Sequence, residues 1–143
     1  MNLINMTLSK GAYYFQTVLK GLGQVMLQNN SATGLLFLLG IFYNSWLMAA
    51  GALLGTIAST ATAFSLNYKK KNIEDGLYGF NGALIGISLL FFFDVQILTF
   101  ILIVIGSAFS SVIMNYALNK KFPAFTFPFV LSTWILLFLI ASL

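Results

Sequence analysis

Between Asp94 and Lys120 the chain carries no charged side chain, and most of this stretch is apolar. A helix over these residues would rise about 1.5 Å per residue, which is enough to cross the roughly 30 Å hydrocarbon core of a bilayer. Charged residues make up 7% of the whole chain, whereas soluble domains contain about a quarter. So few charges cannot cover a surface in water. We therefore predict an all-α integral membrane protein, with residues 1–143 forming a single membrane domain.

The residue types on which most enzymes depend are missing. The chain has no Cys and no His, which excludes disulfides, thiolate metal sites, cysteine nucleophiles and histidine acid–base chemistry. We therefore expect no enzymatic activity, no cofactor and no metal site. The seven basic residues are all Lys and are dispersed among apolar segments, so we expect no nucleic-acid partner.

The N-terminal segments are irregular for a membrane protein. Residues 9–28 predict an amphipathic helix that either lies in the membrane interface or turns a polar stripe toward a wet cavity. The stripe contains residues at every fourth position, namely Gln16, Lys20, Gln24 and Gln28. No secretory signal is evident, so this helix is expected to be retained. Residues 31–43 are apolar but short, and residues 46–66 are long enough to span the membrane.

Glycines at a spacing of four predict close helix packing in two places. Gly51 and Gly55 lie in the first full span, and Gly82 and Gly86 lie in the apolar segment that follows it. Small residues at this spacing let two helix backbones approach one another in lipid.

A charged stretch, residues 67–77, predicts a polar extramembrane loop. The apolar segment after it, residues 78–93, is too short to span comfortably. We therefore predict a re-entrant pore helix there, with Asn81 as its cap. Asp94 is expected to start the next helix, where a carboxylate near the N-terminus is favourable.

The C-terminal third predicts one full span and one interrupted segment. Residues 95–118 are the span. Pro123 and Pro128 force extended backbone on the residues before them, and a last helix follows over residues 129–143. That helix would be about 22 Å long, so non-helical backbone is expected inside the membrane. The prediction is about five transmembrane helices plus one re-entrant helix, and the interrupted segments point to a transport site.

The residues at these breaks are uncharged hydrogen-bonding groups beside apolar walls. They are Gln24 and Leu27, Phe80 and Leu84, and Thr126. Such a set suits a small, neutral, planar and polar solute, and offers nothing that would offset the dehydration of an ion. Each residue alone has an ordinary structural interpretation: an interfacial Gln, core apolar residues and a helix-capping Thr. Their shared position at helix breaks favours a pathway.

Three stretches resemble the urea transporter family, bacterial type. They are GQVMLQNN at residues 23–30, GLYGFNGALIG at 76–86 and PAFTFPFVLSTW at 123–134. The resemblance implies a passive channel built from two inverted halves, each with five spanning helices and one pore helix, with three protomers each holding a pore. One copy of each motif is present, so the chain resembles a single half, one inverted repeat of that architecture.

The resemblance also implies roles for the candidate residues. Gln24 would hydrogen-bond urea near a pore mouth, Phe80 and Leu84 would line the filter, and Thr126 would lie near the pore centre. Leu27 stands where the family often has Phe, so the clamp on this side would be aliphatic.

The expected partners are urea, the lipid bilayer and a second half, and the expected location is the cell (inner or plasma) membrane. The second half is either a second copy of the chain or a separate chain. Formamide and acetamide remain open as further substrates. The alternative is a truncated or auxiliary subunit without transport activity alone.

The lysines bear on the identity of the second half. If residues 78–93 return to the side where they begin, three lysines lie on each side of the membrane, with Lys20 inside the first helix. That balance predicts dual topology, in which two copies insert in opposite orientations.

Overall fold

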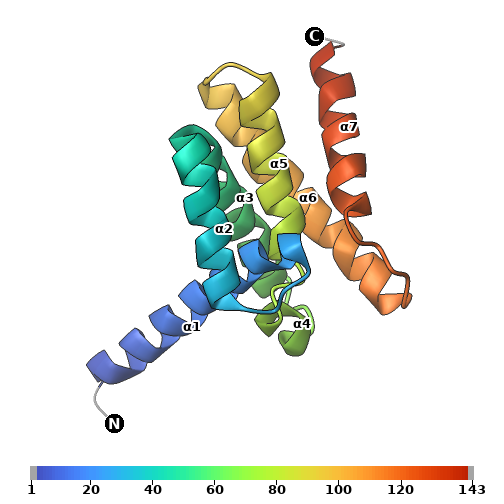
Figure 1. Cartoon of the computed structure of the whole chain (residues 1–143). Coiled ribbons are helices and arrows are strands. Elements are labelled where there is room, and N and C mark those ends of the chain that lie inside the picture. Colours follow the sequence, from blue (N-terminus) through green and yellow to red (C-terminus); the bar gives the residue numbers. More distant parts are fainter. Residues whose placement is uncertain (1–2, 142–143) are drawn as a thin grey trace.

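The computed structural model describes the backbone of residues 3–141 and the side chains of residues 9–140. Within this part the chain is helical throughout, joined by short turns (Figure 1). The elements in chain order are α1 (Leu3–Gly23), the 3₁₀ helix η1 (Gln24–Met26), α2 (Ser31–Asn44), α3 (Trp46–Ser65), α4 (Lys70–Glu74), α5 (Gly79–Phe92), α6 (Ile97–Asn119) and α7 (Phe127–Ala141). Residues 142–143 of the predicted last helix lie outside the described residues.

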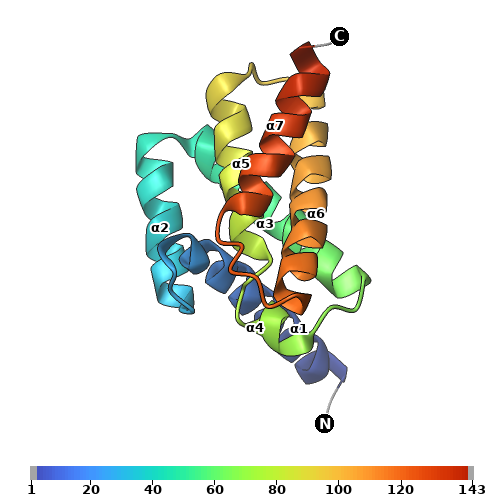
Figure 2. The same cartoon turned by 90° about the vertical axis from the view of Figure 1, so that its right-hand side faces the viewer.

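The helices that run lengthwise through the bundle are α2, α3, α5, α6 and α7, whereas α1 and α4 lie at one of its ends (Figures 1 and 2). The α4 end is formed by α4, the turns beside it and residues 120–126. The opposite end, which we call the Asp94 end, is formed by the turn at Ser45 and by residues 93–96. Residues 122–126 run back from α6 toward the bundle before α7 begins.

Helix length and apolar composition support the prediction of a helical membrane protein. Two helices, α3 with 20 residues and α6 with 23, are long and apolar enough to cross a membrane. The pair formed by α1 and α2 passes the same test together but is bent by 72°. α5 and α7 are apolar and shorter, with 14 and 15 residues.

The bend between α1 and α2 was not predicted. The first helix was expected to run to Gln28, but α1 ends at Gly23. Leu27 adopts a left-handed conformation with φ of 57°, and the Gln28 N–H returns to the Gly23 carbonyl oxygen at 3.1 Å. Asn30 then caps α2, because its side chain accepts hydrogen bonds from the N–H groups of Ala32 and Thr33.

Two further boundaries differ from the prediction. The polar loop contains the short helix α4, which begins at Lys70. Asp94 does not open α6, which begins at Ile97 after Gln96. The Asp94 carbonyl oxygen instead accepts the hydroxyl of Thr99 at 2.8 Å.

The direction of α5 differs from the predicted re-entrant path. It begins next to α4 and ends at the opposite end of the bundle, where a short turn leads into α6 (Figures 1 and 2). α6 then returns to the α4 end. The two ends of α5 therefore do not lie on the same side of the bundle.

The glycine spacing correctly predicted the closest helix contact of the fold. α3 and α5 pack backbone to backbone, with Gly55 facing Gly82 and Gly51 facing Gly86. A methyl group added at Gly82 would overlap the Gly55 carbonyl oxygen, and one at Gly86 would overlap that of Gly51. This contact leaves no room for a side chain, as expected for small residues between helices in lipid.

Candidate functional site

The start of α5 is held in place from three sides. Gly79 lies against Gly21 of α1, where an added Cβ would come within 2.9 Å of the Gly21 Cα. The carbonyl oxygen of Tyr78 accepts a hydrogen bond from the Ser59 hydroxyl of α3. The Tyr78 hydroxyl donates to Asn115 Oδ1 of α6 at 3.0 Å. These contacts fix the backbone at which the candidate residues gather.

Gln24 reaches this junction from η1. It is buried, and its Nε2 donates to the carbonyl oxygen of Asp75 at 2.7 Å, in the turn before α5. Nearby, Asn29 Nδ2 donates to Asp75 Oδ1 at 2.8 Å. Among the described residues Gln24 Oε1 accepts no hydrogen bond, so one amide oxygen remains as an acceptor at this position.

Phe80 and Leu84 follow one another along α5 by one helical turn. Phe80 is 5% exposed and packs in an apolar cluster with Ile73, Met114 and Ala124, whereas Leu84 is half-buried. Leu27 caps η1 and donates its N–H to the Gln24 carbonyl oxygen at 2.9 Å, but its side chain is 67% exposed whereas that of Gln24 is buried. The structure therefore brings Gln24 and Phe80 to one junction and leaves Leu27 on the surface.

Asn81 has a different partner from the one predicted. It was expected to cap its own helix, but it is fully buried in the first turn of α5 and reaches the next crossing instead. Its Nδ2 donates to the Phe125 carbonyl oxygen at 3.3 Å, and its Oδ1 accepts the Phe129 N–H at 3.0 Å. Asn81 thus joins the start of α5 to the start of α7.

Thr126 lies at the end of the segment that Asn81 holds. Its carbonyl oxygen accepts the Val130 N–H at 3.0 Å, as the residue before a helix does. Its side chain is exposed, and its hydroxyl has no hydrogen-bond partner among the described residues. Phe125 beside it has a positive φ of 43°, which turns the chain into α7.

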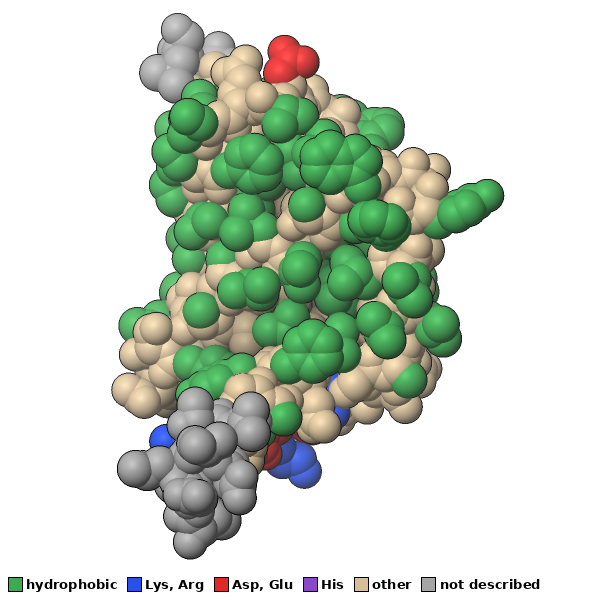
Figure 3. Space-filling view, turned by 90° about the vertical axis from the view of Figure 1, so that its left-hand side faces the viewer, with side chains coloured by type: hydrophobic (Ala, Val, Ile, Leu, Met, Phe, Trp, Pro, Cys, Tyr) green, Lys and Arg blue, Asp and Glu red, His purple; other side chains and the backbone are tan. Residues whose placement is uncertain are grey.

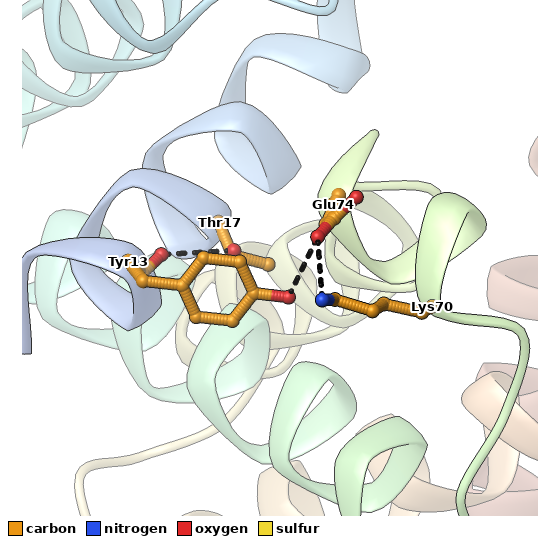
Figure 4. A network of polar contacts seen from close by, with 4 residues as sticks. All are labelled: Tyr13, Thr17, Lys70 and Glu74. Carbon is orange, nitrogen blue, oxygen red and sulfur yellow. Dashed lines mark hydrogen bonds and ion pairs between the residues drawn. The ribbon is translucent and has the colours of Figure 1, made fainter. Parts of the chain in front are cut away.

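Lys70 and Glu74 of α4 form a separate polar network with Tyr13 of α1 (Figure 4). Tyr13 donates its hydroxyl to Glu74 Oε1 at 3.3 Å, and Lys70 Nζ lies 3.6 Å from the same oxygen. This pair is largely exposed, so it contributes little to stability. In the neighbouring turn, burial raises the pKa of the Tyr68 hydroxyl, which therefore stays neutral.

Sequence comparison identifies relatives of the chain. The family described as "Urea transporter" matches residues 15–143. The chain belongs to the urea transporter family. It is 32% identical over 123 residues to Urea transporter 1 of Ovis aries and 33% identical over 128 residues to that of Mus musculus. The alignments cover 78% and 81% of the chain but 31% and 32% of the relatives, so the chain spans about a third of their length.

Membership of the urea transporter family confirms the predicted resemblance and supports the prediction of a membrane transport protein rather than an enzyme. The residue that sequence reasoning undervalued is Asn81. An Asn in the first turn of a helix ordinarily suggests a local cap, and only the fold reveals that residues 125 and 129 lie within its reach.

Proposed function

We propose that the chain provides one half of a passive channel for urea. The observation that carries this proposal is the junction at the start of α5. There the buried Gln24 bonds to the turn before α5, Phe80 is buried in the first turn of α5, and Asn81 bonds to the segment that ends at Thr126. Uncharged acceptors and apolar walls are the groups that such a solute needs.

The chemistry of this set favours urea over ions. Urea is planar and neutral, and it loses several kcal/mol for each polar group that gives up water without a new partner. The oxygens of Gln24 and Thr126 would accept its N–H groups, while Phe80 and Leu84 would contact its faces. An ion would find no fixed charge in this set to replace its hydration shell. Formamide and acetamide share the relevant groups and are proposed as weaker substrates.

The pathway needs a second wall. Leu27 is 67% exposed, and on α7 Trp134 and Phe138 are 69% and 75% exposed. A second half, either another copy or a separate chain, would cover the open flank, and three such pores would assemble together in the cell membrane. The same exposed flank favours the alternative of an auxiliary subunit without transport activity alone.

Urea flux into liposomes tests the proposal. Reconstitution from detergent inserts proteins in both directions, so upright and inverted copies can pair in the same vesicle. We expect fast, saturable urea flux that a bulky urea analogue blocks. Flux no faster than that of empty liposomes would reject a channel formed by this chain alone and favour the auxiliary role.

Thr126→Val tests the pathway itself. It keeps the side-chain shape and removes a hydroxyl whose hydrogen bond to urea is worth about 1 kcal/mol, so we expect several-fold slower flux. Thr62→Val is the matched control, because the Thr62 hydroxyl bonds to the Ala58 carbonyl oxygen of its own helix at 2.8 Å. Equal flux in the two variants would place Thr126 outside the pathway.

A further inference from the structure

All the lysines of the chain lie at one end of the bundle. Lys69, Lys70 and Lys71 lie at α4, and Lys120 and Lys121 follow the last turn of α6. These two groups belong to the same end, because Ile73 of α4 packs in one cluster with Ala117 of α6. The remaining two lysines, at positions 10 and 20, lie on α1.

α1 belongs to this end as well. The Tyr13 hydroxyl bonds to Glu74 of α4 (Figure 4). Gln24 bonds to the turn that follows α4. In both ribbon views α1 and α4 lie together, away from the turn at residues 93–96 (Figures 1 and 2).

The charges are therefore strongly asymmetric. Seven lysines against Glu74 and Asp75 leave the α4 end with a net charge of +5, and Asp94 gives the other end −1, which together make the +4 of the chain. Figure 3 shows the two charged ends separated by a broad apolar face. An apolar face between charged ends matches a bilayer with an aqueous phase on each side.

This arrangement corrects the balanced count made from the sequence. That count assumed that the first helix crosses the membrane and that residues 78–93 return to the side where they begin. Because α5 crosses to the Asp94 end and α6 returns, Lys120 and Lys121 join the other lysines instead of opposing them. In this arrangement the lysine count no longer favours dual topology.

We propose that every copy of the chain inserts in one orientation, with the α4 end at the cytoplasmic membrane surface. Lysine-rich ends stay on the cytoplasmic side during insertion. Anionic headgroups on that side attract each Lys near the surface by about 1 kcal/mol. The Asp94 end has no Lys to oppose this preference.

A consequence for the partner follows, and it rests on the proposed function. An inverted copy would have to carry all seven lysines across the membrane. The half that completes the pore in a cell is therefore a different sequence, fused or separate, whose basic residues gather at the end equivalent to the Asp94 end. In the assembled pore the basic ends of both halves would then face the cytoplasm.

Cysteine accessibility tests the orientation, since the chain has no Cys of its own. Ser65→Cys and Asn119→Cys place exposed thiols at the α4 end, and Val95→Cys places one at the Asp94 end. With a membrane-impermeant maleimide on intact cells, we expect Val95→Cys to label about tenfold or more above the other two, since 1.4 kcal/mol corresponds to tenfold. After cell lysis, we expect the three cysteine variants to be labelled to the same extent. Comparable labelling of both ends in intact cells, or the reverse order, would overturn the proposal.

A charge-transfer variant tests the cause. Replacing Lys69, Lys70 and Lys71 by Gln while introducing Val95→Lys and Gln96→Lys should expose the Ser65→Cys thiol to the outside in part of the copies. An unchanged labelling pattern would show that the lysines do not set the orientation.

Flux measurements test the partner separately. We expect urea flux in liposomes, where both orientations mix, and none above background in cells that make only this chain. Urea flux in those cells, together with one-sided labelling, would overturn the partner inference. Absence of flux in liposomes would reject a channel formed by this chain alone, favour the auxiliary role and leave the labelling result standing.

Discussion

Asn81 is the residue whose replacement should most clearly separate packing from pathway. Asn81→Ala removes the hydrogen bonds of a fully buried side chain to the Phe125 carbonyl oxygen and from the Phe129 N–H, together with a contact to Met114 Sδ at 4.0 Å. Hydrogen bonds inside membrane proteins contribute about 0.6 kcal/mol on average and about 1.7 at most. A buried group left without a partner costs about 1 to 3 kcal/mol. We therefore expect the free energy of unfolding to fall by about 1 to 3 kcal/mol.

The assay is reversible unfolding in mixed detergent micelles, followed by circular dichroism, together with urea flux in liposomes. Asn81→Leu fills a similar volume without the hydrogen bonds, so equal losses in both variants would assign the effect to hydrogen bonding rather than to a cavity. Ser88→Ala is the control on the same helix, because its hydroxyl bonds to the nearby Ile85 carbonyl oxygen at 3.1 Å.

We expect both Asn81 variants to slow urea flux as well, because the Thr126 segment loses its attachment to α5. The reasoning would be refuted if Asn81→Ala and Asn81→Leu were no less stable than Ser88→Ala and carried urea at the same rate.

Three further substitutions have defined outcomes. Gly82→Ala should prevent recovery of a monodisperse protein by gel filtration, since the added methyl overlaps the backbone of α3, whereas Gly40→Ala, with nothing within 4 Å, should be neutral or stabilising. Gln24→Leu loses the bond to Asp75, so we expect about 1 kcal/mol less stability and slower flux, while the exposed Gln16→Leu should leave flux unchanged. Asn30→Ala removes the cap of α2 and should lower the unfolding free energy by about 0.5 to 2 kcal/mol. A monodisperse Gly82→Ala protein would contradict the backbone contact between α3 and α5. Unchanged stability and flux in Gln24→Leu, or unchanged stability in Asn30→Ala, would contradict the role assigned to that side chain's hydrogen bonds.

Features that depend on residues close together in the chain could be predicted from the sequence. The apolar runs identified the long helices. The last helix was expected from residue 129, but Phe127, predicted to be extended because it precedes Pro128, already begins α7. The glycine pairs predicted close packing because a spacing of four places both glycines on one helix face, where they can contact only another backbone.

Features that depend on distant contacts could not be predicted. The end of α1 relies on a left-handed Leu27, a residue type that does not favour this conformation. The direction of α5 is decided by its packing on α3 and by the turn into α6. Neither contact produces a recognisable sequence pattern in residues 78–93. The charge count depended on the path of residues 78–93, so it changes with the direction of α5.

The candidate residues divide in the same way. Gln24 and Thr126 were selected for their position at helix breaks, and the structure finds both beside non-helical backbone near α5. Leu27 was grouped with Gln24 on the assumption of a continuous helix, which the bend after Gly23 removes.

The meeting of α5 and α7 has an electrostatic consequence. Asn81, in the first turn of one helix, bonds to the Phe129 N–H, in the first turn of the other, so the two N-termini converge. A helix N-terminus carries a partial charge of about +0.5, produced by aligned peptide dipoles. In a channel built at this junction, the resulting positive potential would repel ammonium and sodium ions while attracting the carbonyl oxygen of urea. The backbone itself would then discriminate against cations without any charged side chain.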